Sequence, residues 1–385
     1  MILNVSIENF RSIKKANISL PKFSAVIGKN SSGKSNFISA ISLLKDLSSG
    51  KNLEESLTKI APLGPELFYF HNYNNTESKF KFSIQSNQGN KFRYEYFIVP
   101  KRIGLTVEHE LLSQVIDNKE KIIYRREKEN AFKGEPNEEK IPFKIDPDKL
   151  MLSSYSDEQV KEVVKTISGY TIIDTMPESN NLMVINAKSP DLNSIDGVVI
   201  SLFNKNHGRF SSAINSIKKI IPYFEEPVLT PLPDLHKKND SPEGEEEKLF
   251  VVMWKERNFP EQYSNLSLSH GDRKIIHLIF SLFNTPEKSF FIAEEIENGM
   301  HFERMSRLVD QIRTQASNRK IQVLFTTHSS EILKRLTVNE VIYCRKNKDK
   351  GTELDQMKDT EEYEAIKNEL GSGNACEVIQ TGLFD

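Results

Sequence analysis

The sequence predicts an α/β protein organised around one glycine-bearing loop, with an antiparallel β subdomain and an inserted helical lobe. Three observations predict this fold class. A glycine-bearing loop lies near the beginning of the chain, between a short apolar run and an amphipathic helix. Two apolar runs near the end, within 289–295 and 321–329, finish in polar residues. Alternating apolar and polar residues between 78 and 126 indicate paired strands.

The glycine-bearing loop, Gly28–Ser35, reads Gly-x-x-x-x-Gly-Lys-Ser, which is the pattern of a phosphate-binding loop. The apolar run Ser24–Ile27 suits a buried strand, and the helix that follows the loop ends at Ser49-Gly50. Backbone N–H groups of such a loop and of the helix N-terminus hold phosphates. Lys34 would reach the β- and γ-phosphates, and Ser35 would complete the Mg²⁺ shell. The pattern predicts ATP or GTP as the ligand and leaves the purpose of its hydrolysis open.

Composition bounds the class of protein. The chain has 385 residues, and 52 basic against 54 acidic residues give a net charge of −2, so no overall basic field attracts nucleic acid. No apolar run approaches the roughly 20 residues of a membrane span, and residues 1–20 lack a signal-peptide core. The two cysteines, Cys344 and Cys376, favour free thiols in a reducing compartment. We therefore expect a soluble, cytoplasmic protein with no membrane contact.

The first 126 residues predict mainly β structure. Residues 1–20 suggest two strands bent around Asn9–Ser12, where Arg11 is equally well explained as a nucleotide contact or as a solvated turn residue. Residues 78–99 predict a hairpin that turns at 87–90. A further pair of strands is expected at Leu105–Leu111 and Ile122–Arg126.

The middle of the chain predicts loops and helices. Charge and proline indicate a loop over 127–149, with a short extended piece at Phe143 and Ile145. In chain order we then expect a helix at 156–168, a polar turn-rich stretch at 177–196, helices at Val198–Phe203 and Phe210–Ile221, a solvated loop at 223–247 that contains the acidic run Glu243–Glu247, and a strand at Leu249–Trp254.

A second group of signals lies in the last third of the chain. Ser269 is placed to cap an apolar helix at its N-terminus, an end that can hold phosphate, although alone a capped core helix is the simpler interpretation. One buried strand ends in Glu294 and Glu295, where Glu294 would hold Mg²⁺ and Glu295 would activate water. Another ends in Thr326–Ser329, where His328 would contact the γ-phosphate or the water. Parallel strands bring such ends to one edge of the sheet.

In this order the motifs resemble the ABC-type ATPases of the RecF and SMC class, and more closely the bacterial predicted AAA family ATPases that share their head with OLD-family proteins. The resemblance covers nearly the whole chain. Its segments are the N-terminal strand and turn Ile7–Ile13, the Walker A loop Gly28–Asn36, the shortened signature Leu268–Gly271, the extended Walker B segment Glu294–His301, the switch-histidine segment Thr326–Ser329 and the tail Glu369–Leu383. The SMC coiled-coil arm and the OLD nuclease domain have no counterpart in the sequence.

The resemblance implies ATP and Mg²⁺ as cofactors and a homodimer in which two heads sandwich two ATP molecules. The implied nucleotide-binding residues of one subunit are Asn30, Ser31, Ser32, Gly33, Lys34, Ser35, Asn36 and Arg11. Ser35 and Glu294 would hold Mg²⁺, and Glu295 and His328 would act in catalysis. Ser269 and Gly271 would contact the γ-phosphate bound to the partner subunit.

The sequence also departs from the family pattern. Glu294 stands where an aspartate is usual, which predicts slow hydrolysis. The signature contains His270 and Asp272, and an acid beside the partner's triphosphate would weaken the dimer unless Arg273 or Lys274 offsets it. Two glutamines, Gln85 and Gln114, are candidates for the Q-loop, and ordinary surface glutamines are the simpler interpretation of each.

We expect three parts: residues 1–150 and 286–385 as the two portions of the ATP-binding lobe, and 151–285 as the helical lobe that carries the signature. The expected function is an ATP-hydrolysing switch that dimerises on ATP and controls a separate effector, such as a nuclease or toxin, in phage defence or DNA maintenance. Two alternatives remain. A RecF-like repair ATPase would bind DNA directly through a basic groove, and a scaffold would bind ATP with little turnover.

Overall fold

The computed structural model describes residues 1–58, 77–101, 104–134, 140–142, 146–173, 184–186, 190–231, 249–257, 259–370 and 375–380. The main sheet of this part of the chain contains, in spatial order, β8 (Asn130–Lys133), β7 (Lys119–Glu127), β6 (Leu105–Ile116), β5 (Lys91–Pro100), β4 (Ser78–Gln85), β1 (Ile2–Phe10), β2 (Ile13–Ser19), β16 (Gly351–Gln356), β15 (Val341–Asn347), β3 (Phe23–Ile27), β14 (Gln322–Thr326), β13 (Phe290–Ala293) and β9 (Thr171–Ile173). A smaller sheet contains β10 (Val184–Asn186), β12 (Leu249–Met253) and β11 (Val228–Pro231).

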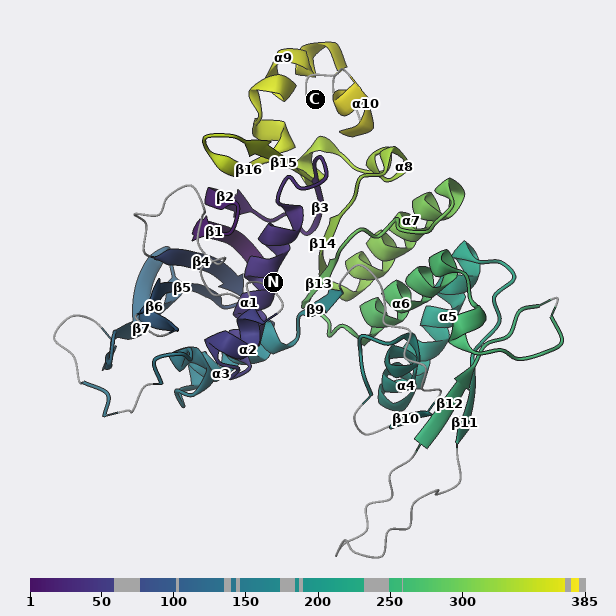
Figure 1. Cartoon of the computed structure of the whole chain (residues 1–385), viewed down its shortest axis with the longest axis horizontal. Coiled ribbons are helices and arrows are strands. Elements are labelled where there is room, and N and C mark those ends of the chain that lie inside the picture. Colours follow the sequence, from purple (N-terminus) through teal and green to yellow (C-terminus); the bar gives the residue numbers. More distant parts are fainter. Residues whose placement is uncertain are drawn as a thin grey trace, which may run out of the picture.

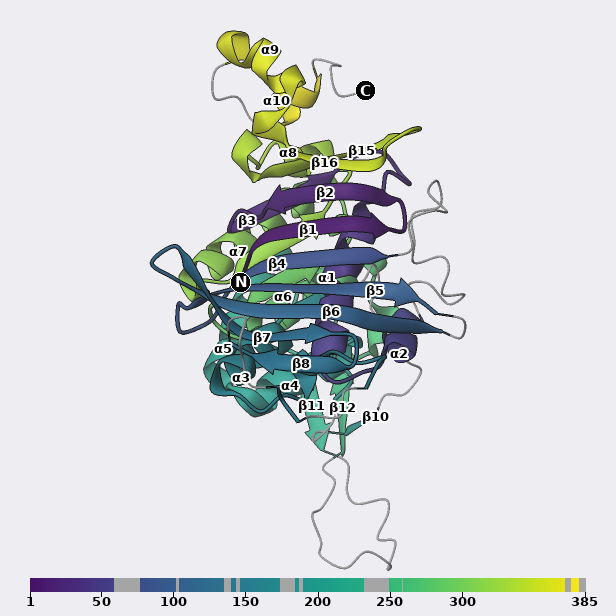
Figure 2. The same cartoon turned by 90° about the vertical axis from the view of Figure 1, so that its left-hand side faces the viewer.

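The main sheet has an antiparallel part and a parallel part. Strands from β8 to β16 pair with antiparallel neighbours, and Figure 2 shows them stacked in this order. Strands β15, β3, β14, β13 and β9 pair in parallel. The carboxyl ends of the parallel strands therefore meet at one edge of the sheet, and their amino ends meet at the opposite edge.

Ten helices are described: α1 (Lys34–Ser48), α2 (Leu53–Leu57), α3 (Glu158–Ser168), α4 (Ile195–Lys205), α5 (His207–Ile220), α6 (His270–Asn284), α7 (Phe302–Arg319), α8 (Ser330–Leu333), α9 (Glu361–Leu370) and α10 (Ala375–Gln380). Helix α1 covers one face of the parallel strands, and α6 and α7 cover the other (Figure 1). Successive strand residues point to opposite faces, so Val26 packs in the α1 core while Ala25 and Ile27 pack in the α6 core.

The antiparallel β subdomain contains the predicted hairpin, β4 and β5. Phe80 lies opposite Tyr96, and the two rings stack with centroids 4.9 Å apart. The expected second pair is present and longer, as β6 and β7. The loop expected over 127–149 was wrong in part, because it contains β8, which pairs with the edge of β7. Its sequence, Asn-Ala-Phe-Lys, is too short to show an alternating pattern.

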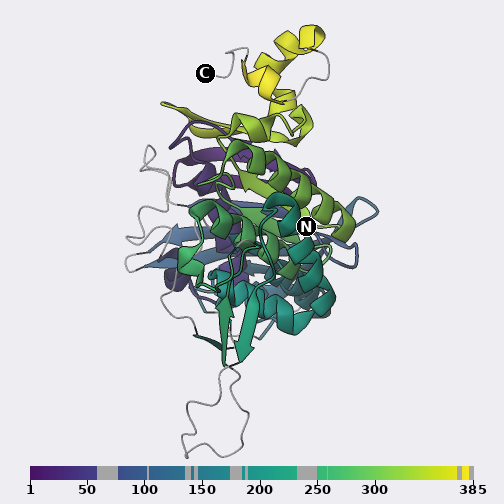
Figure 3. The ribbon, with the colours of Figure 1, turned by 90° about the vertical axis from the view of Figure 1, so that its right-hand side faces the viewer.

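The helices α4, α5 and α6 pack together beside the smaller sheet, and Figure 3 views this side of the molecule. The predicted helices at 198–203 and 210–221 are confirmed as α4 and α5. Helix α3 packs against α1 in the other core, and β9 extends the main sheet. These two elements precede α4, so the helices of the signature-bearing part begin at residue 195. The division at 150 and 285 stays a prediction.

Several expectations lie outside the described residues: the extended piece at Phe143 and Ile145, half of 177–196, the acidic run Glu243–Glu247 and much of the tail after Leu370. Two short strands, β10 and β11, occupy described parts of stretches that were expected to lack regular structure. Both cysteines are free and buried. Across the described helices, none combines the length and the apolar character that crossing a membrane requires.

Candidate functional site

Three adjacent parallel strands deliver the predicted site residues to one edge of the sheet. Strand β3 leads into the loop that begins at Gly28, β13 leads into Glu294 and Glu295, and β14 leads into Thr327 and His328. The backbone N–H of Glu295 donates to Thr326 Oγ1 at 2.8 Å, which ties two of these ends together. Segments more than 260 residues apart in sequence are thus neighbours, as the sequence predicted.

The phosphate-binding loop has the backbone that its glycines permit. Gly28 and Gly33 have φ angles of +151° and +113°, and Ser31 between them has φ +62°. Both glycines also face neighbouring strands. A Cβ on Gly28 would lie 1.9 Å from the carbonyl oxygen of Cys344, and one on Gly33 would lie 2.2 Å from Thr352 Oγ1. Strands β15 and β16 are therefore in close contact with the loop, and a larger residue at Gly28 or Gly33 would clash with them.

Hydrogen bonds fasten the loop and the start of α1 to the strands beside them. Thr352 Oγ1 donates to the Ser32 carbonyl at 2.7 Å, and it lies 2.7 Å from Ser12 Oγ. Asn36 Nδ2 donates to the same Ser12 hydroxyl at 2.5 Å. Arg11 lies next to Ser12 with φ +50°. The role of Asn36 and Arg11 in nucleotide binding stays a prediction, since the contact seen for Asn36 holds the loop in place.

Lys34 lies at the start of α1 with its ammonium group folded over the loop. Its Nζ donates to the carbonyl oxygens of Gly28 at 2.9 Å and Lys29 at 3.0 Å. Burial lowers the pKa of Lys34, while the nearby carboxylates of Glu295 and others partly oppose this shift. A phosphate could compete for this cation, because its oxygens carry more negative charge than the two carbonyls.

Ser35 and Glu294 form the group that fits a magnesium ion. Ser35 Oγ donates to Glu294 Oε2 at 2.6 Å, so the loop serine and the strand-end carboxylate already share one small volume. A hydroxyl and a carboxylate oxygen are hard ligands, and Mg²⁺ bound with phosphates needs only one or two protein ligands. This agrees with the described residues, which hold no larger cluster of metal-binding side chains. The longer side chain of Glu294 thus reaches Ser35.

Glu295, the candidate base, is held in an unusual backbone conformation. Its φ of +44° lies in the left-handed region, which non-glycine residues rarely adopt. The side chain of Asn298 fixes the carboxylate, with Nδ2 donating to Glu295 Oε2 at 2.5 Å. Such backbone strain is typical of functional sites.

A third acid, Glu297, was not predicted. Its Oε1 accepts the backbone N–H of His328 at 2.5 Å, while its Oε2 is buried and has no hydrogen-bond partner within the described structure. Burial and the positive charge of Lys34 lower the pKa of His328, so its ring is neutral at pH 7. A neutral ring can both donate and accept a hydrogen bond. Glu297 thus joins the Walker B segment to the switch-histidine segment.

The signature segment begins α6, on the sheet face opposite α1. Ser269 caps the helix as predicted: its Oγ accepts the Asp272 N–H at 3.1 Å and donates to Asp272 Oδ2 at 2.8 Å. Asp272 is buried and also accepts from Arg304 Nη1 at 2.5 Å and from the Tyr223 hydroxyl at 3.0 Å. The sequence predicted that Asp272 would need Arg273 or Lys274 as a counter-charge. In the structure Arg304 forms the ion pair with Asp272.

The signature and the Walker B segment of one chain touch directly. A Cβ on Gly271 would lie 2.4 Å from the Gly299 carbonyl oxygen. Lys274, which is fully buried, donates from Nζ to the carbonyl oxygen of Glu294 at 3.1 Å. The first turns of α6 are therefore in direct contact with the end of β13 and the turn after it.

The contacts of four residues in this region were not predicted: Lys274, Glu297, Asn298 and Arg304. Lys274 was named only as a charge that could offset Asp272, and Glu297 and Asn298 only as parts of the Walker B segment. The repeated acids of Glu294-Glu295-Ile296-Glu297 were a usable signal for Glu297. The Q-loop candidates fare differently: Gln85 lies far along β4 at the opposite edge of the sheet, and Gln114 accepts a hydrogen bond from Gln159 at 3.2 Å. Neither contacts the loop at Gly28–Ser35 in the described structure.

Comparison with solved structures confirms the fold. An SMC head bound to the C-winged helix domain of ScpA covers 92% of this chain and 96% of its own, with 13% sequence identity and a TM-score of 0.54. The SMC head domain from Thermotoga maritima covers 92% of this chain and 98% of its own, with 13% identity and a TM-score of 0.47. No curated protein sequence matches the chain.

Comparison with protein families gives a more specific result. A family model described as "AAA domain, putative AbiEii toxin, Type IV TA system" matches residues 23–334. This range begins at the strand before the phosphate-binding loop and ends just after the switch histidine, so it contains every motif assembled at the edge of the sheet. The chain therefore belongs to this AAA ATPase family, and its fold is that of an ABC-type ATPase head of the SMC and RecF class.

Proposed function

We propose that the protein is an ATP-hydrolysing switch that dimerises on ATP and thereby controls a separate effector protein. The hydrogen bond between Ser35 Oγ and Glu294 Oε2 carries this proposal, because it places the phosphate-binding loop against the acidic strand end. Glu295 follows directly and carries a carboxylate that Asn298 already orients. A site that held nucleotide without hydrolysing it would have no need for a second, separately oriented acid.

Each residue has a distinct role in the proposed reaction. The backbone N–H groups of residues 30–36 and the Lys34 ammonium hold the phosphates, and Ser35 with Glu294 holds Mg²⁺. Bound Mg²⁺ supplies positive charge that balances the phosphate oxygens. Glu295 orients the attacking water and takes its proton. His328, neutral at pH 7, donates a hydrogen bond to the γ-phosphate or to that water.

The second half of the site would come from another copy of the chain. Ser269 and Gly271 lie at the N-terminus of α6, where free N–H groups and the helix dipole favour an anion. Helix α6 lies across the sheet from α1, which supports a role for this end toward the partner's nucleotide. Hydrolysis would then loosen the dimer, because the γ-phosphate joins the two subunits.

The effector and the biological setting rest on the comparisons. The family description names a putative toxin of a type IV toxin–antitoxin system, and the similar SMC head is bound to a domain of another protein, ScpA. By analogy this chain would pass its assembly state to a separate nuclease or toxin in phage defence or DNA maintenance. The proposed ATP hydrolysis takes place in the cytoplasm.

Glu295→Gln is the test of the proposed reaction. Glutamine keeps the shape of the side chain and can still meet Asn298, but it cannot take a proton. We expect ATP turnover to fall about 100-fold or more, as loss of a general base typically does. ATP binding should be retained, and dimers should accumulate with ATP in analytical ultracentrifugation because hydrolysis no longer separates them.

Glu303→Gln is the matched control, since this exposed acid on α7 undergoes the same change in charge and shape. It should hydrolyse ATP as the unmodified protein does. Equal turnover in the Glu295→Gln variant and the unmodified protein would contradict the role of Glu295 as base. Binding of ATP with no turnover in either would instead identify an ATP-binding scaffold.

A further inference from the structure

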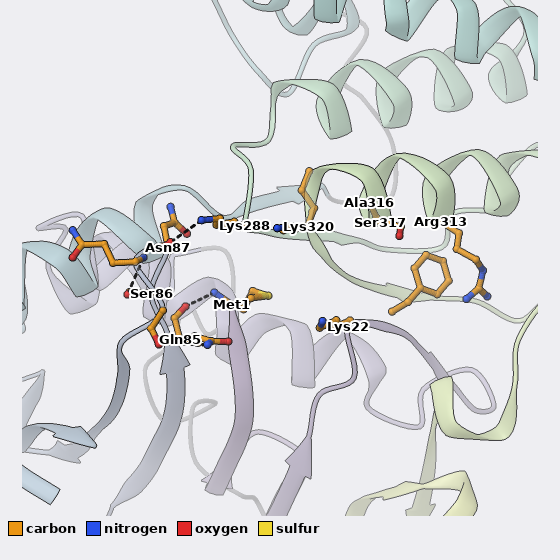
Figure 4. Close-up of a pocket in the computed structure, with 14 residues that line it drawn as sticks. Met1, Lys22, Gln85, Ser86, Asn87, Lys288, Arg313, Ala316, Ser317 and Lys320 are labelled. Atoms are coloured by element: carbon orange, nitrogen blue, oxygen red, sulfur yellow. Dashed lines mark hydrogen bonds between the residues drawn. The ribbon is translucent and has the colours of Figure 1, made fainter. Parts of the chain in front are cut away.

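A cavity of about 860 Å³ opens at the edge of the parallel sheet opposite the candidate site. It lies where β3, β14 and β13 begin, and β4 and the turn after it form the other wall (Figure 4). Ligands of α/β proteins normally bind at the carboxyl ends of the strands, so this cavity does not belong to the nucleotide site. Its volume is within the range of pockets that bind small molecules.

Three lysines from three neighbouring strands surround this cavity. Lys22 directly precedes β3, and Lys320 and Lys288 stand two residues before β14 and β13. The register pairs Phe290 with Gln322, so Lys288 and Lys320 are level with each other. Adjacent strands are about 4.8 Å apart, so the three backbone positions span on the order of 10 Å. Figure 4 shows all three side chains at the cavity. We call them the lysine row.

The lysine row is not balanced by acids of the cavity. None of the described lining residues is Asp or Glu. The nearest acid in sequence, Glu287, pairs with Arg209 at 2.7 Å. The lining also contains Arg313, but this guanidinium is paired with Glu340 and stacks on the Phe23 ring at 4.2 Å. Arg313 therefore forms part of the wall, and the lysine row supplies the unbalanced charge.

The backbone at two of these lysines does not favour lysine. Lys288 and Lys320 have φ angles of +56° and +54°, where glycine or asparagine is the usual choice. Lys320 caps the C-terminus of α7, and a cation there suits the helix dipole. Lys288 lies beside the same helix end, since its N–H donates to the Arg319 carbonyl oxygen at 3.2 Å, and its Nζ donates to the Asn87 carbonyl oxygen at 3.5 Å. No such explanation applies to Lys22.

We propose that the lysine row binds a ligand that carries two or more phosphate groups. Three lysines whose backbone positions span about 10 Å favour a ligand with several separated negative charges. The remaining polar lining, which includes the amides of Gln85 and Gln88 and the hydroxyl of Ser317, matches the lysine, amide and hydroxyl donors that contact phosphates in proteins. A free polyphosphate compound and a short stretch of nucleic acid share this chemistry.

The test measures binding alone and does not depend on ATP hydrolysis. Sodium tripolyphosphate is titrated by calorimetry, and a fluorescent thymidine tetranucleotide by anisotropy, both with saturating ADP in the phosphate-binding loop. The variant combines Lys22→Gln, Lys288→Gln and Lys320→Gln. We expect at least tenfold weaker binding in this variant. For the tetranucleotide, loss of three contacts should also reduce the slope of log affinity against log salt by about 2.

The control combines Lys14→Gln, Lys119→Gln and Lys348→Gln, which removes the same charge from exposed lysines outside the cavity lining. It should bind both probes as the unmodified protein does. Binding of tripolyphosphate alone supports a free compound as the ligand, and binding of the tetranucleotide supports nucleic acid. Three results would overturn the proposal: binding of neither probe, equal losses in variant and control, or an octaglutamate peptide that binds as tightly as tripolyphosphate.

Discussion

At the scale of single residues, His277 shows how strongly the core of the α6 region constrains charge. Its ring is buried on α6, and Nε2 lies 3.2 Å from the Leu192 carbonyl oxygen, to which it donates. Burial lowers the pKa of His277 from 6.5 to about 4. The hydrogen bond to Leu192 opposes this shift, Lys274 adds to it, and Asp191 opposes it weakly. The unfolded chain therefore binds a proton at a higher pH than the folded protein does.

The sign of the resulting pH dependence follows directly. Stability from neutral His277 is complete above pH 6.5 and is lost as the pH falls toward 4. Between pH 6.5 and about 5, we expect the unmodified protein to lose about 1–2 kcal/mol more unfolding free energy than His277→Gln. Urea denaturation at both pH values measures this difference. His301→Gln, at an exposed position, should follow the unmodified protein, and parallel pH curves for all three would contradict the prediction.

The sequence identified residues whose chemistry is local. The loop pattern identified Lys34 and Ser35. The capping pattern identified Ser269 as the N-cap of its helix, and the structure confirms this cap. The contact of Lys274 with Glu294 was not predicted, because a lysine in the first turns of a helix is ordinarily solvated. Only the contact of α6 with the end of β13 buries this lysine and directs it to Glu294.

At the scale of elements, the contact between α6 and the Walker B segment depends on Gly271. A methyl group there would meet the Gly299 carbonyl oxygen at 2.4 Å, and backbone cannot yield as a flexible side chain can. We expect Gly271→Ala to lower the free energy of unfolding by about 1–3 kcal/mol, as overpacking typically does. It should also weaken ATP-dependent dimerisation, since the start of α6 must shift.

Gly208→Ala is the control for this change. Gly208 lies in the first turn of α5, where an added Cβ meets only Asn206 Oδ1, at 3.4 Å. Its unfolding free energy should change by less than about 0.5 kcal/mol. Denaturant titration of both variants measures the difference, and equal stability of Gly271→Ala and the unmodified protein would show that α6 does not rest on Gly299.

Elements with a clear hydrophobic period could be predicted from the sequence, whereas the strands that lie beside the phosphate-binding loop in space could not. The β4–β5 hairpin alternates cleanly, so its pattern identified it. Strands β15 and β16 carry mixed residues and were missed, although they lie between β2 and β3 and explain why Gly28 and Gly33 must be glycine. Which strands are adjacent depends on contacts between distant segments, and local patterns do not contain that information.

At the scale of the whole molecule, the parallel strands join two charged regions. Their carboxyl ends hold the candidate nucleotide site, and their amino ends hold the lysine row. The sequence showed the first because its residues follow known motifs. It could not show the second, because Lys22, Lys288 and Lys320 come from separate segments that only the order β3-β14-β13 brings together. A net charge of −2 therefore coexists with a local basic surface.

The proposed dimer makes a prediction that only two copies of the chain can test. Lys34→Ala removes nucleotide binding within a subunit. Ser269→Asp can still accept the Asp272 N–H as an N-cap, but it loses the hydrogen bond to Asp272 Oδ2 and places a negative charge where the partner's triphosphate would bind. Each variant alone should hydrolyse little ATP. In an equal mixture, half of the dimers would be mixed, and each mixed dimer would contain one site in which both contributions are intact. We therefore expect about a quarter of the unmodified turnover to return.

ATPase assays of each variant and of the mixture measure this recovery, with thermal unfolding to establish that both variants are folded. The recovery should follow the concentration of mixed dimers, because neither variant can regain activity within its own chain. An equal mixture of Lys34→Ala and Glu295→Gln is the control. These residues act in the same half of the site, so every composite site in the mixed dimer carries one defect and no turnover should return. No recovery with Ser269→Asp would place the signature in the site of its own subunit. Recovery in the control would show that Lys34 and Glu295 of one subunit act in different sites.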